Sequence, residues 1–296
     1  MKVGFIGLGA MGLHMARSLH RAGWLAGVWN RSPDKARALA AETGAIAADS
    51  PAALARACDA VVLCVSADRD VLEVVDALAP GARRGLLVLD CSTVSAATAR
   101  EAAARLAPLG VEFLDCPVSG GVEGARDAKL TIMVGGTPEA FELARPVLAK
   151  MGKAVTLMGP TGAGQATKAT NQILCAGAIQ AAAEAMAFAK AEGLPLERVV
   201  EALGQGAGSS WYFVNRAPNM VRGAYPPGFR VRLHEKDLKI CRTMAERHGV
   251  HLPIVEMTLV HFERLIAAGH GDEDVSSLFR LKDAMFEAGA AGPRSG

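Results

Sequence analysis

Residues 1–23, MKVGFIGLGAMGLHMARSLHRAG, pass from a short apolar run through a glycine-rich turn into a helical pattern. The turn has the spacing G-x-G-x-x-G. Its first glycine permits a tight turn, its second lets the backbone approach a pyrophosphate, and its third lets the helix pack closely on the strand. The helix N-terminus then meets the phosphate charge. Because the motif ends a predicted strand and opens a predicted helix, it predicts a dinucleotide site rather than a purely structural glycine turn. The residues assigned to this site are Gly7, Leu8, Gly9, Ala10, Met11 and Gly12.

The first half of the chain alternates short apolar runs with helical segments. Three of these segments open with a hydroxyl residue followed by proline, a pair that favours a helix start, at 32–33, 50–51 and 137–138. Strict alternation of strand and helix implies crossover connections and a mostly parallel sheet with helices on both faces. Strands are predicted at 2–6, 25–29, 60–65, 86–90, 111–115, 130–134 and 154–158.

Beyond residue 160 the pattern is helical. Helices are predicted at 164–191, 195–204, 234–248, 253–268 and 275–288, with glycine- and proline-rich loops at 204–213 and 223–229. The predicted fold class is therefore α/β. We expect an N-terminal Rossmann-type, doubly wound parallel sheet over residues 1–161, followed by an all-α domain for substrate binding and oligomerisation over residues 162–296.

Composition excludes several classes of function. The 296 residues carry a net charge of only +2 without a basic cluster, so we expect no nucleic-acid partner. The N-terminus lacks a signal-peptide pattern, and we expect no membrane span because residues 173–191 are interrupted by Gln180 and Glu184. A cytoplasmic protein is therefore expected.

The six cysteines form no C-x-x-C pair and are interpreted as free thiols. His248 and His251 have no carboxylate or cysteine at a spacing that would complete a metal site, so no metal site is expected.

The end of the second predicted strand bears on the choice of dinucleotide. A site that prefers NAD usually has Asp or Glu there, to accept a hydrogen bond from the ribose 2′-hydroxyl. This chain has Asn30, Arg31 and Ser32 instead. Without a carboxylate nothing repels a 2′-phosphate, and an arginine can pair with one. NADP is therefore favoured over NAD, with a solvated Arg31 as the alternative reading.

Two further segments carry polar groups in unusual places. Ser119, Gly120 and Gly121 follow the strand predicted at 111–115, and the backbone amides of such a turn can bind an anion, although the turn can equally be an ordinary loop. Lys168 lies about two turns into the alanine-rich helix, with Asn171 and Gln172 one turn later. Taken alone, this lysine is most simply one that extends to solvent.

The sequence resembles the β-hydroxyacid dehydrogenases over nearly its whole length. The motifs that carry the resemblance occur in the family's order: VGFIGLGAMG (3–12), DCSTVS (90–95), DCPVSGG (115–121), GAGQATKATNQ (162–172) and PGFRVRLHEKDL (227–238). The resemblance implies that Lys168 is the acid/base residue and that the Ser-Gly-Gly turn holds a substrate carboxylate. Burial among Ala and Ile would disfavour the charged form of the lysine, as a proton donor and acceptor near neutral pH requires.

The resemblance assigns further residues to the site. It places Thr93 and Lys236 near the cofactor, Phe229 in the pocket wall, and the Val65-Ser66 turn under the cofactor. Many relatives have Asn four residues after the lysine, where this chain has Gln172, so either Asn171 or Gln172 is expected to contact the substrate. Relatives also often have Leu-Pro in place of Val65-Ser66. Trp211, with Tyr212 and Asn215, is expected in a loop over the pocket; a role in domain packing is the alternative for Trp211.

The expected function is oxidation of a small 3-hydroxy acid, or reduction of its semialdehyde, with NADP or NAD. A 3-hydroxyisobutyrate-like substrate suits the aromatic Trp211 better than a sugar phosphate does. One alternative is a tartronate or succinic semialdehyde reductase of the glyoxylate type. Another is a catalytically silent dinucleotide-binding interaction protein; an imine reductase is disfavoured because Lys168 is present. Relatives are commonly dimers or tetramers, so a homodimer or homotetramer is expected.

Overall fold

The computed structural model describes residues 1–290, and the chain divides into two compact units, Met1–Lys168 and Ala169–Gly296. The domain boundary predicted from the sequence, after residue 161, lies seven residues before the boundary between the units, after Lys168. The difference arises because the first turns of the long helix belong to unit 1. The last six residues of the predicted second domain lie outside the described part.

Unit 1 is built on a nine-stranded sheet in the order β3-β2-β1-β4-β5-β6-β8-β7, with β9 paired to β8. Strands β1 to β6 are parallel; β8 runs antiparallel to β6 and β7 and parallel to β9. The mostly parallel, doubly wound sheet expected from the sequence is confirmed. The strands are β1 (Val3–Ile6), β2 (Leu25–Trp29), β3 (Ile46–Ala47), β4 (Ala60–Leu63), β5 (Leu87–Asp90), β6 (Glu112–Asp115), β7 (Val118–Ser119), β8 (Leu130–Gly135) and β9 (Gly152–Gly159).

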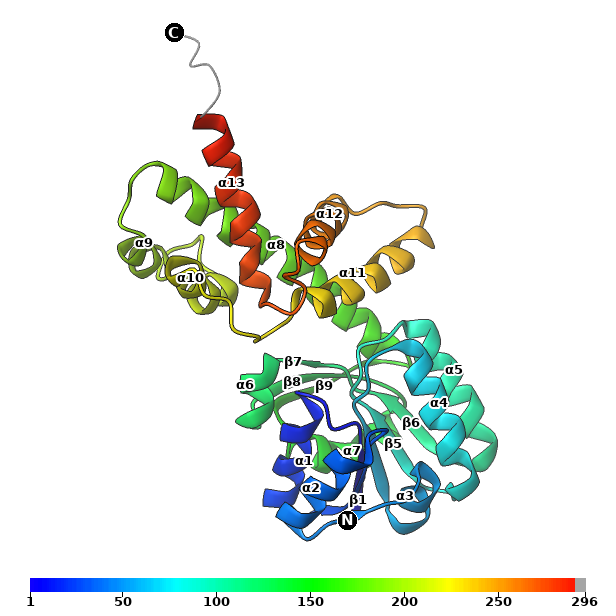
Figure 1. Ribbon diagram of the computed structural model, residues 1–296. Helices are drawn as coiled ribbons and strands as arrows, with labels where there is room; N and C mark the ends of the chain where they lie inside the picture. Colours follow the sequence, from blue (N-terminus) through cyan, green and yellow to red (C-terminus); the bar gives the residue numbers. More distant parts are fainter. Residues whose placement is uncertain (291–296) are drawn as a thin grey trace. The chain divides into compact units, whose positions relative to one another are not determined.

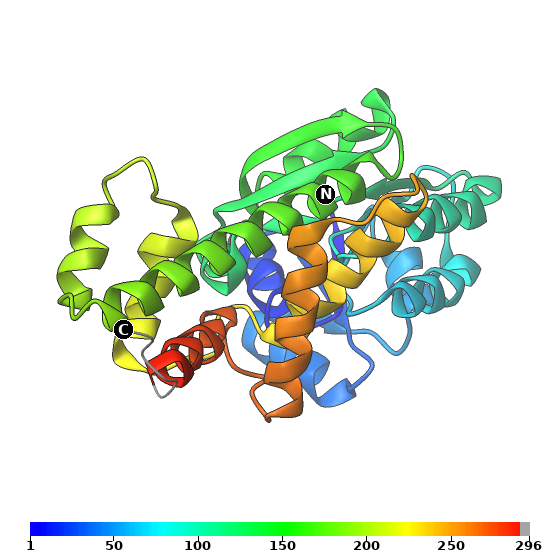
Figure 2. The same cartoon turned by 90° about the horizontal axis from the view of Figure 1, so that it is seen from above.

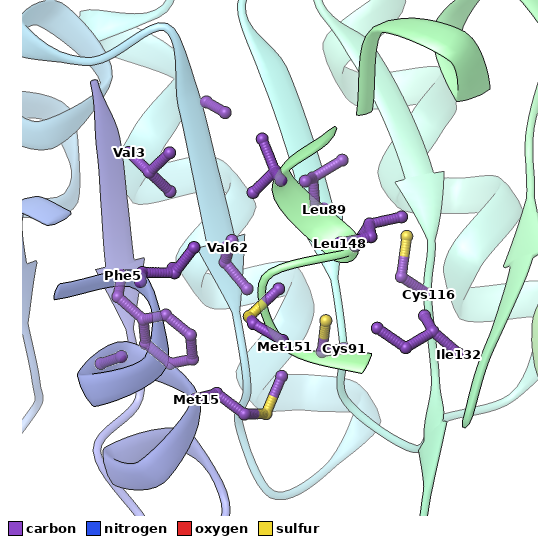
Figure 3. Packing of buried hydrophobic residues seen from close by; sticks show 14 of the residues in the cluster. Val3, Phe5, Met15, Val62, Leu89, Cys91, Cys116, Ile132, Leu148 and Met151 are labelled. Carbon is purple, nitrogen blue, oxygen red and sulfur yellow. The ribbon is translucent and has the colours of Figure 1, made fainter. Parts of the chain in front are cut away.

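Helices cover both faces of this sheet (Figure 1). One face packs against α1 (Gly12–Arg21), α2 (Pro33–Thr43) and α7 (Pro138–Leu148), and the other against α3 (Pro51–Ala57), α4 (Asp68–Leu78) and α5 (Ala96–Leu106). Figure 3 shows Phe5, Met15 and Leu148 among the side chains of the first of these cores. Residues of β1, β4 and β5 are buried on both faces, as crossover helices require. The remaining helices of the unit are α6 (Gly121–Arg126) and the 3-10 turns η1 (Ala79–Gly81) and η2 (Ala107–Leu109).

The three predicted helix starts are present, and two make the expected capping bond. Ser50 Oγ accepts from the Ala53 N–H, and Thr137 Oγ1 accepts from the Ala140 N–H. Ser32 precedes α2 without a capping bond from its side chain. Proline at the first helical position is thus the feature that all three share.

Unit 2 is helical and is organised around α8 (Ala163–Ala191), which starts in unit 1. Figure 2 shows α8 as a single long helix, with α11 and α12 side by side. The core of the unit contains Ile179 and Met186 of α8 together with Leu238, Phe262 and Phe279 from later helices. These helices are α9 (Leu196–Leu203), α10 (Trp211–Arg222), α11 (Val231–Glu246), α12 (Pro253–Ala267), η3 (Val275–Leu278) and α13 (Phe279–Ala290).

The loop predicted over residues 204–213 is shorter than expected, because α10 begins at Trp211. Trp211 and Asn215 therefore lie on a helix, which corrects the loop assignment. Ser210 caps this helix by accepting from the Phe213 N–H. The glycines before the helix and Pro218 within it are typical of loops, so the sequence did not indicate a helix here. Ser210 followed by an apolar run does indicate a helix start.

The mean hydropathy of α8 comes near that of a membrane span, although Gln180 and Glu184 interrupt its apolar residues. Among residues 1–290, this helix alone is long and apolar enough to cross a bilayer, yet half of its most apolar window is buried inside the protein. Its Gln180 is buried and donates to Thr258 Oγ1 and contacts His261 Nδ1. The apolar composition of α8 is thus that of a core helix.

Candidate active site

The polar turns predicted to bind cofactor and substrate follow four neighbouring parallel strands. β1, β4, β5 and β6 end at Ile6, Leu63, Asp90 and Asp115, and their carboxyl ends share one edge of the sheet. We call the segments that follow them, residues 7–12, 64–66, 91–94 and 116–121, the edge turns. The sheet order reverses between β1 and β4, and ligands of open α/β sheets bind at such a switch point.

The glycines of the first edge turn have the geometry of a dinucleotide cradle. Gly7 has φ +96°, and a Cβ there would lie 2.2 Å from the Cys64 carbonyl oxygen. A Cβ on Gly12 would lie 1.9 Å from the Gly7 carbonyl oxygen, so α1 packs closely against the turn. By contrast, no atom lies within 4 Å of a Cβ placed on Gly9. The backbone at Gly9 is therefore open to a pyrophosphate at the N-terminus of α1, and these residues fit a dinucleotide.

The segment after β2 supports the first edge turn. The Leu8 N–H donates to Asn30 Oδ1 at 2.8 Å, and Asn30 Nδ2 donates to the Ser32 carbonyl at 3.1 Å. Asn30 thus holds together two segments that are predicted to bind the cofactor. The Arg31 side chain is 79% exposed and pairs with Asp70 at 3.1 Å. A cavity of about 320 Å³ adjoins this turn, with Leu8, Gly9, Ala10 and Lys35 in its wall.

The second and third edge turns are joined by one serine. The Val65 N–H donates to Ser92 Oγ at 2.9 Å, so the Val65-Ser66 turn is tied to the turn that carries Thr93. The Ser92 N–H donates to Asp90 Oδ1 at 3.0 Å. These bonds are short and partly or fully buried, which fixes the two turns relative to each other.

The last residue of β6 anchors the start of α8. Asp115 Oδ1 accepts from the Gly162 N–H at 2.7 Å, and its Oδ2 accepts from the Gln165 N–H at 2.8 Å. A Cβ on Gly164 would lie 2.5 Å from the Met133 carbonyl oxygen, so only glycine allows this approach. Asp115 is fully buried, and burial raises its pKa even though the backbone hydrogen bonds oppose the rise. The carboxylate caps the helix that carries Lys168.

A second buried carboxyl lies beside Asp115 in the sheet. Asp90 is its partner in the register of β5 and β6, and burial raises the pKa of Asp90 to about 7. Its Oδ2 has no hydrogen-bond partner within the described residues. A carboxyl in this setting holds a proton in the folded state at pH values where the unfolded chain has already lost it.

This difference predicts a pH effect on stability. Between pH 4 and pH 7 only the folded state keeps the proton on Asp90, so the contribution of Asp90 to the free energy of unfolding should fall as pH rises, by about 1 kcal/mol per pH unit. We expect Asp90→Asn to remove this fall, measured as urea unfolding curves from pH 4 to pH 8. Asp34→Asn, at a side chain that is 90% exposed, is the control. An Asp90→Asn protein with the wild-type pH slope would contradict the assignment.

The proposed substrate residues of unit 1 lie close to these anchors. Lys168 is 7% exposed and lies three residues after Gln165, on the same face of α8. Ser119 is half-buried in β7, four residues after Asp115, and pairs with Thr131 of β8. Gly120 and Gly121 have φ +133° and +65°, a conformation that favours glycine. Asp115 thus anchors the helix that carries Lys168 and precedes the segment that carries Ser119.

In unit 2, Asn171 and Gln172 belong to one hydrogen-bond network. Gln172 is 1% exposed; its Nε2 donates to Asp237 Oδ2 at 2.7 Å, and its Oε1 accepts from Asn171 Nδ2 at 2.9 Å. Asp237 also pairs with Lys236 at 3.0 Å. Asn171 is half-buried and its Nδ2 also contacts Cys175 Sγ. The structure therefore joins three of the predicted residues of this unit.

The two predicted aromatic residues of unit 2 lie outside that network. Phe229 stacks on His234 with ring centroids 5.0 Å apart, and its N–H donates to Asp274. Trp211 is 52% exposed and lies 5.0 Å from the Arg216 guanidinium, which itself pairs with Asp274. Asp274 thus links the surroundings of Phe229 and Trp211.

Two family models together cover most of the chain. One, described as the NAD binding domain of 6-phosphogluconate dehydrogenase, matches residues 2–159. The other, described as the NAD-binding of NADP-dependent 3-hydroxyisobutyrate dehydrogenase, matches residues 162–282. The chain belongs to the β-hydroxyacid dehydrogenase family. The family resemblance of the sequence motifs is thereby confirmed, and this β-hydroxyacid dehydrogenase is an enzyme that uses NAD or NADP.

Relatives of this dehydrogenase have different named activities. It is 37% identical over 283 residues to L-threonate dehydrogenase of Cupriavidus necator, with 94% of this chain and 95% of the relative covered. It is 34% identical over 288 residues to 2-hydroxy-3-oxopropionate reductase of Escherichia coli, covering 96% and 98%. A solved 3-hydroxyisobutyrate dehydrogenase of Salmonella typhimurium has a TM-score of 0.84 and 36% identity, covering 95% and 99%. The names agree on the class of reaction and differ in the substrate.

Sequence patterns missed the residues that hold the dehydrogenase's site together. Asp90, Ser92, Asp115 and Gln165 lie inside quoted motifs. Only the structure shows that the side chains of Ser92, Asp115 and Gln165 bind backbone groups of other segments, and that Asp90 binds the Ser92 N–H within its own turn. A polar residue three positions before a proposed catalytic lysine was the one available signal. In the part of the chain that the structure covers, no group of three or more His, Cys, Asp or Glu side chains could hold a metal ion.

Proposed function

We propose that this dehydrogenase oxidises a small 3-hydroxy acid, or reduces its semialdehyde, and that Lys168 is the general acid/base. A 3-hydroxyisobutyrate-like acid is the favoured substrate. The observation that carries the proposal is the position of Lys168: it is buried, and it lies one helical turn from the residue that binds the turn containing Thr93. An ordinary lysine that extends to solvent would not be 93% covered.

The proposed roles account for each atom that moves. When bound, NAD(P) supplies the hydride acceptor for the C–H of the alcohol carbon. Neutral Lys168 takes the hydroxyl proton as the carbonyl forms, and in the reverse direction its ammonium returns that proton. Ser119 Oγ and the amides of Gly120 and Gly121 bind the substrate carboxylate. A carboxylate one carbon removed from the reacting carbon lets both groups act on one molecule.

Of the two amides after the lysine, Asn171 is the better candidate for the substrate contact. Both ends of the Gln172 carboxamide are engaged, with Asp237 and Asn171, and its side chain is 1% exposed. Breaking these bonds to reach a substrate would leave the Asp237 carboxylate without this donor. Gln172 therefore orients Asn171, while Asn171 is half-buried. We assign Phe229 and Trp211 to the pocket on the family resemblance, with Thr93, Lys236 and the Val65-Ser66 turn assigned to the cofactor.

The runner-up is a semialdehyde reductase of the tartronate or succinic semialdehyde type. The name of the Escherichia coli relative, 2-hydroxy-3-oxopropionate reductase, favours it. The same residues serve both reactions, because reduction is the reverse of oxidation at the same carbon. A screen of 3-hydroxyisobutyrate, glycerate, 3-hydroxypropionate, L-serine and their aldehydes, with each dinucleotide, tests the proposal. Highest kcat/KM for 3-hydroxyisobutyrate supports it; no turnover of any 3-hydroxy acid or semialdehyde would contradict it.

We also propose NADP as the preferred dinucleotide, because Arg31 stands where an NAD site has a carboxylate. Arg31→Ala should raise the KM for NADP about tenfold, or about 1.4 kcal/mol, and leave the KM for NAD unchanged. Steady-state kinetics with both dinucleotides measure this. Arg37→Ala, at another exposed arginine in this region, is the control. An unchanged preference for NADP in the Arg31 variant would show that the argument from the second strand is wrong.

The remaining proposals concern the state of the protein in the cell. We propose a homodimer or homotetramer, supported by exposed apolar side chains on α8 and α12, including Leu174, Met257 and Val260. Burial of such side chains in a partner interface would be favourable. The family's metabolic reactions and the core role of α8 support a cytoplasmic enzyme.

A further inference from the structure

We propose that Gln165 is a positioning residue for the reaction: its carboxamide fixes the turn that carries Thr93 to the helix that carries Lys168. This inference rests on the proposed function for its kinetic consequence, and on hydrogen bonds within unit 1 for its structural part. Gln165 has no role in the motif assignments made above.

The Gln165 side chain binds the backbone on both sides of Thr93. Its Nε2 donates to the Ser92 carbonyl at 2.8 Å, and its Oε1 accepts from the Val94 N–H at 3.2 Å. Gln165, Ser92 and Val94 are 1–2% exposed. A glutamine carboxamide has a donor and an acceptor side by side. The Gln165 carboxamide therefore satisfies both the Ser92 carbonyl and the Val94 N–H. Water cannot readily substitute in so closed a position.

The backbone of Gln165 is fixed as well. Its N–H donates to Asp115 Oδ2 at 2.8 Å, so its side chain extends from the turn of α8 that Asp115 anchors. Lys168 lies three residues later on the same helical face. Ser92 in turn accepts from the Val65 N–H. One chain of hydrogen bonds therefore runs from the Val65-Ser66 turn through Ser92 to Gln165, and one helical turn further lies Lys168.

This arrangement sets the distance between Thr93 and Lys168, which are both proposed to lie beside the reacting carbon of the substrate. Thr93 is assigned to the nicotinamide side and Lys168 to the hydroxyl proton. Hydride and proton transfer require both in place together, and a displacement of about 1 Å can lower a rate about 100-fold. The structural part of Gln165's role is local, so its loss should affect catalysis more than cofactor binding.

The test replaces Gln165 with methionine, which preserves the length and approximate volume of the side chain but not its hydrogen bonds. We expect Gln165→Met to lower kcat about 30-fold, with a larger primary deuterium isotope effect because hydride transfer becomes rate-limiting. The dissociation constant of the dinucleotide should change far less. Amide hydrogen exchange at Val94 should accelerate at least about tenfold, because its acceptor is gone.

Gln180→Met is the matched control. Gln180 is a buried glutamine of the same helix that also binds distant residues, Thr258 and His261, but none of the edge turns. A kcat and a Val94 exchange rate in the Gln165 variant equal to those of the Gln180 variant would overturn the inference. If the wild type turned over no 3-hydroxy acid or semialdehyde, the proposed function would fail, while unchanged Val94 exchange would separately refute the Gln165 contact.

Discussion

Replacing Lys168 with alanine is expected to lower kcat about 1,000-fold, within the range that a positioned general acid or base contributes. The proton of the substrate hydroxyl then has no acceptor among the residues assigned to the site. The dissociation constant of NADP should stay close to that of the wild type, because the glycine-rich turn and Asn30 do not involve Lys168. Formation of the reduced dinucleotide, followed by absorbance, measures kcat; fluorescence titration measures binding.

Lys190→Ala provides the control for this variant. Lys190 lies on the same helix but pairs with Asp283 and is 47% exposed. It should keep wild-type kcat. A Lys168→Ala enzyme that retains kcat within a small factor of the Lys190 variant would show that another group moves the proton.

The second large effect is expected at Asp115. Asp115→Ala should lower the free energy of unfolding of unit 1 by about 3 kcal/mol, because at least two buried backbone N–H groups at the start of α8 lose a charged acceptor. The cost exceeds that of an ordinary helix cap, which is about 1 kcal/mol. Thr137→Ala removes such an ordinary cap from α7 and is the matched comparison. Urea unfolding with probes in each unit measures both variants.

The Asp115→Ala variant tests the proposed active site as well as the stability of unit 1. Since Asp115 also fixes the backbone of Gln165, its variant should lose activity together with helix anchoring. Equal destabilisation by Asp115→Ala and Thr137→Ala would contradict the anchoring role. It would indicate that water or other groups replace the carboxylate at no additional cost.

The Rossmann half was predictable because its signals are local. Each predicted strand contains a short apolar run, and those of β1, β4 and β5 are buried on both faces. The glycine spacing specifies a close approach that Gly7 and Gly12 then show. The two-residue strands β3 and β7 were not predicted, since periodicity needs more residues than they contain. The start of α10 was missed because glycine and proline composition outweighed the cap at Ser210.

The residues proposed to contact ligands were easier to single out than those that support them. Lys168 and Ser119 lie in motifs that carry the family resemblance. The roles of Asp115 and Gln165 depend on contacts between segments 47 to 73 residues apart, which no local pattern specifies. The choice between Asn171 and Gln172 likewise needed the contact of Gln172 with Asp237 on a distant helix.

The central claim is that the Lys168 amine transfers the proton of a 3-hydroxy acid. Its most direct test is chemical rescue of Lys168→Ala: single-turnover reduction of NADP by 3-hydroxyisobutyrate, measured with increasing methylamine. A small amine that occupies the space left by the side chain can take the same proton. We predict a rate that rises with the concentration of neutral methylamine, while the Gln165→Met enzyme, which keeps its lysine, gains nothing. A Lys168→Ala rate that is already at the wild-type level, or one that no amine changes, would contradict the claim.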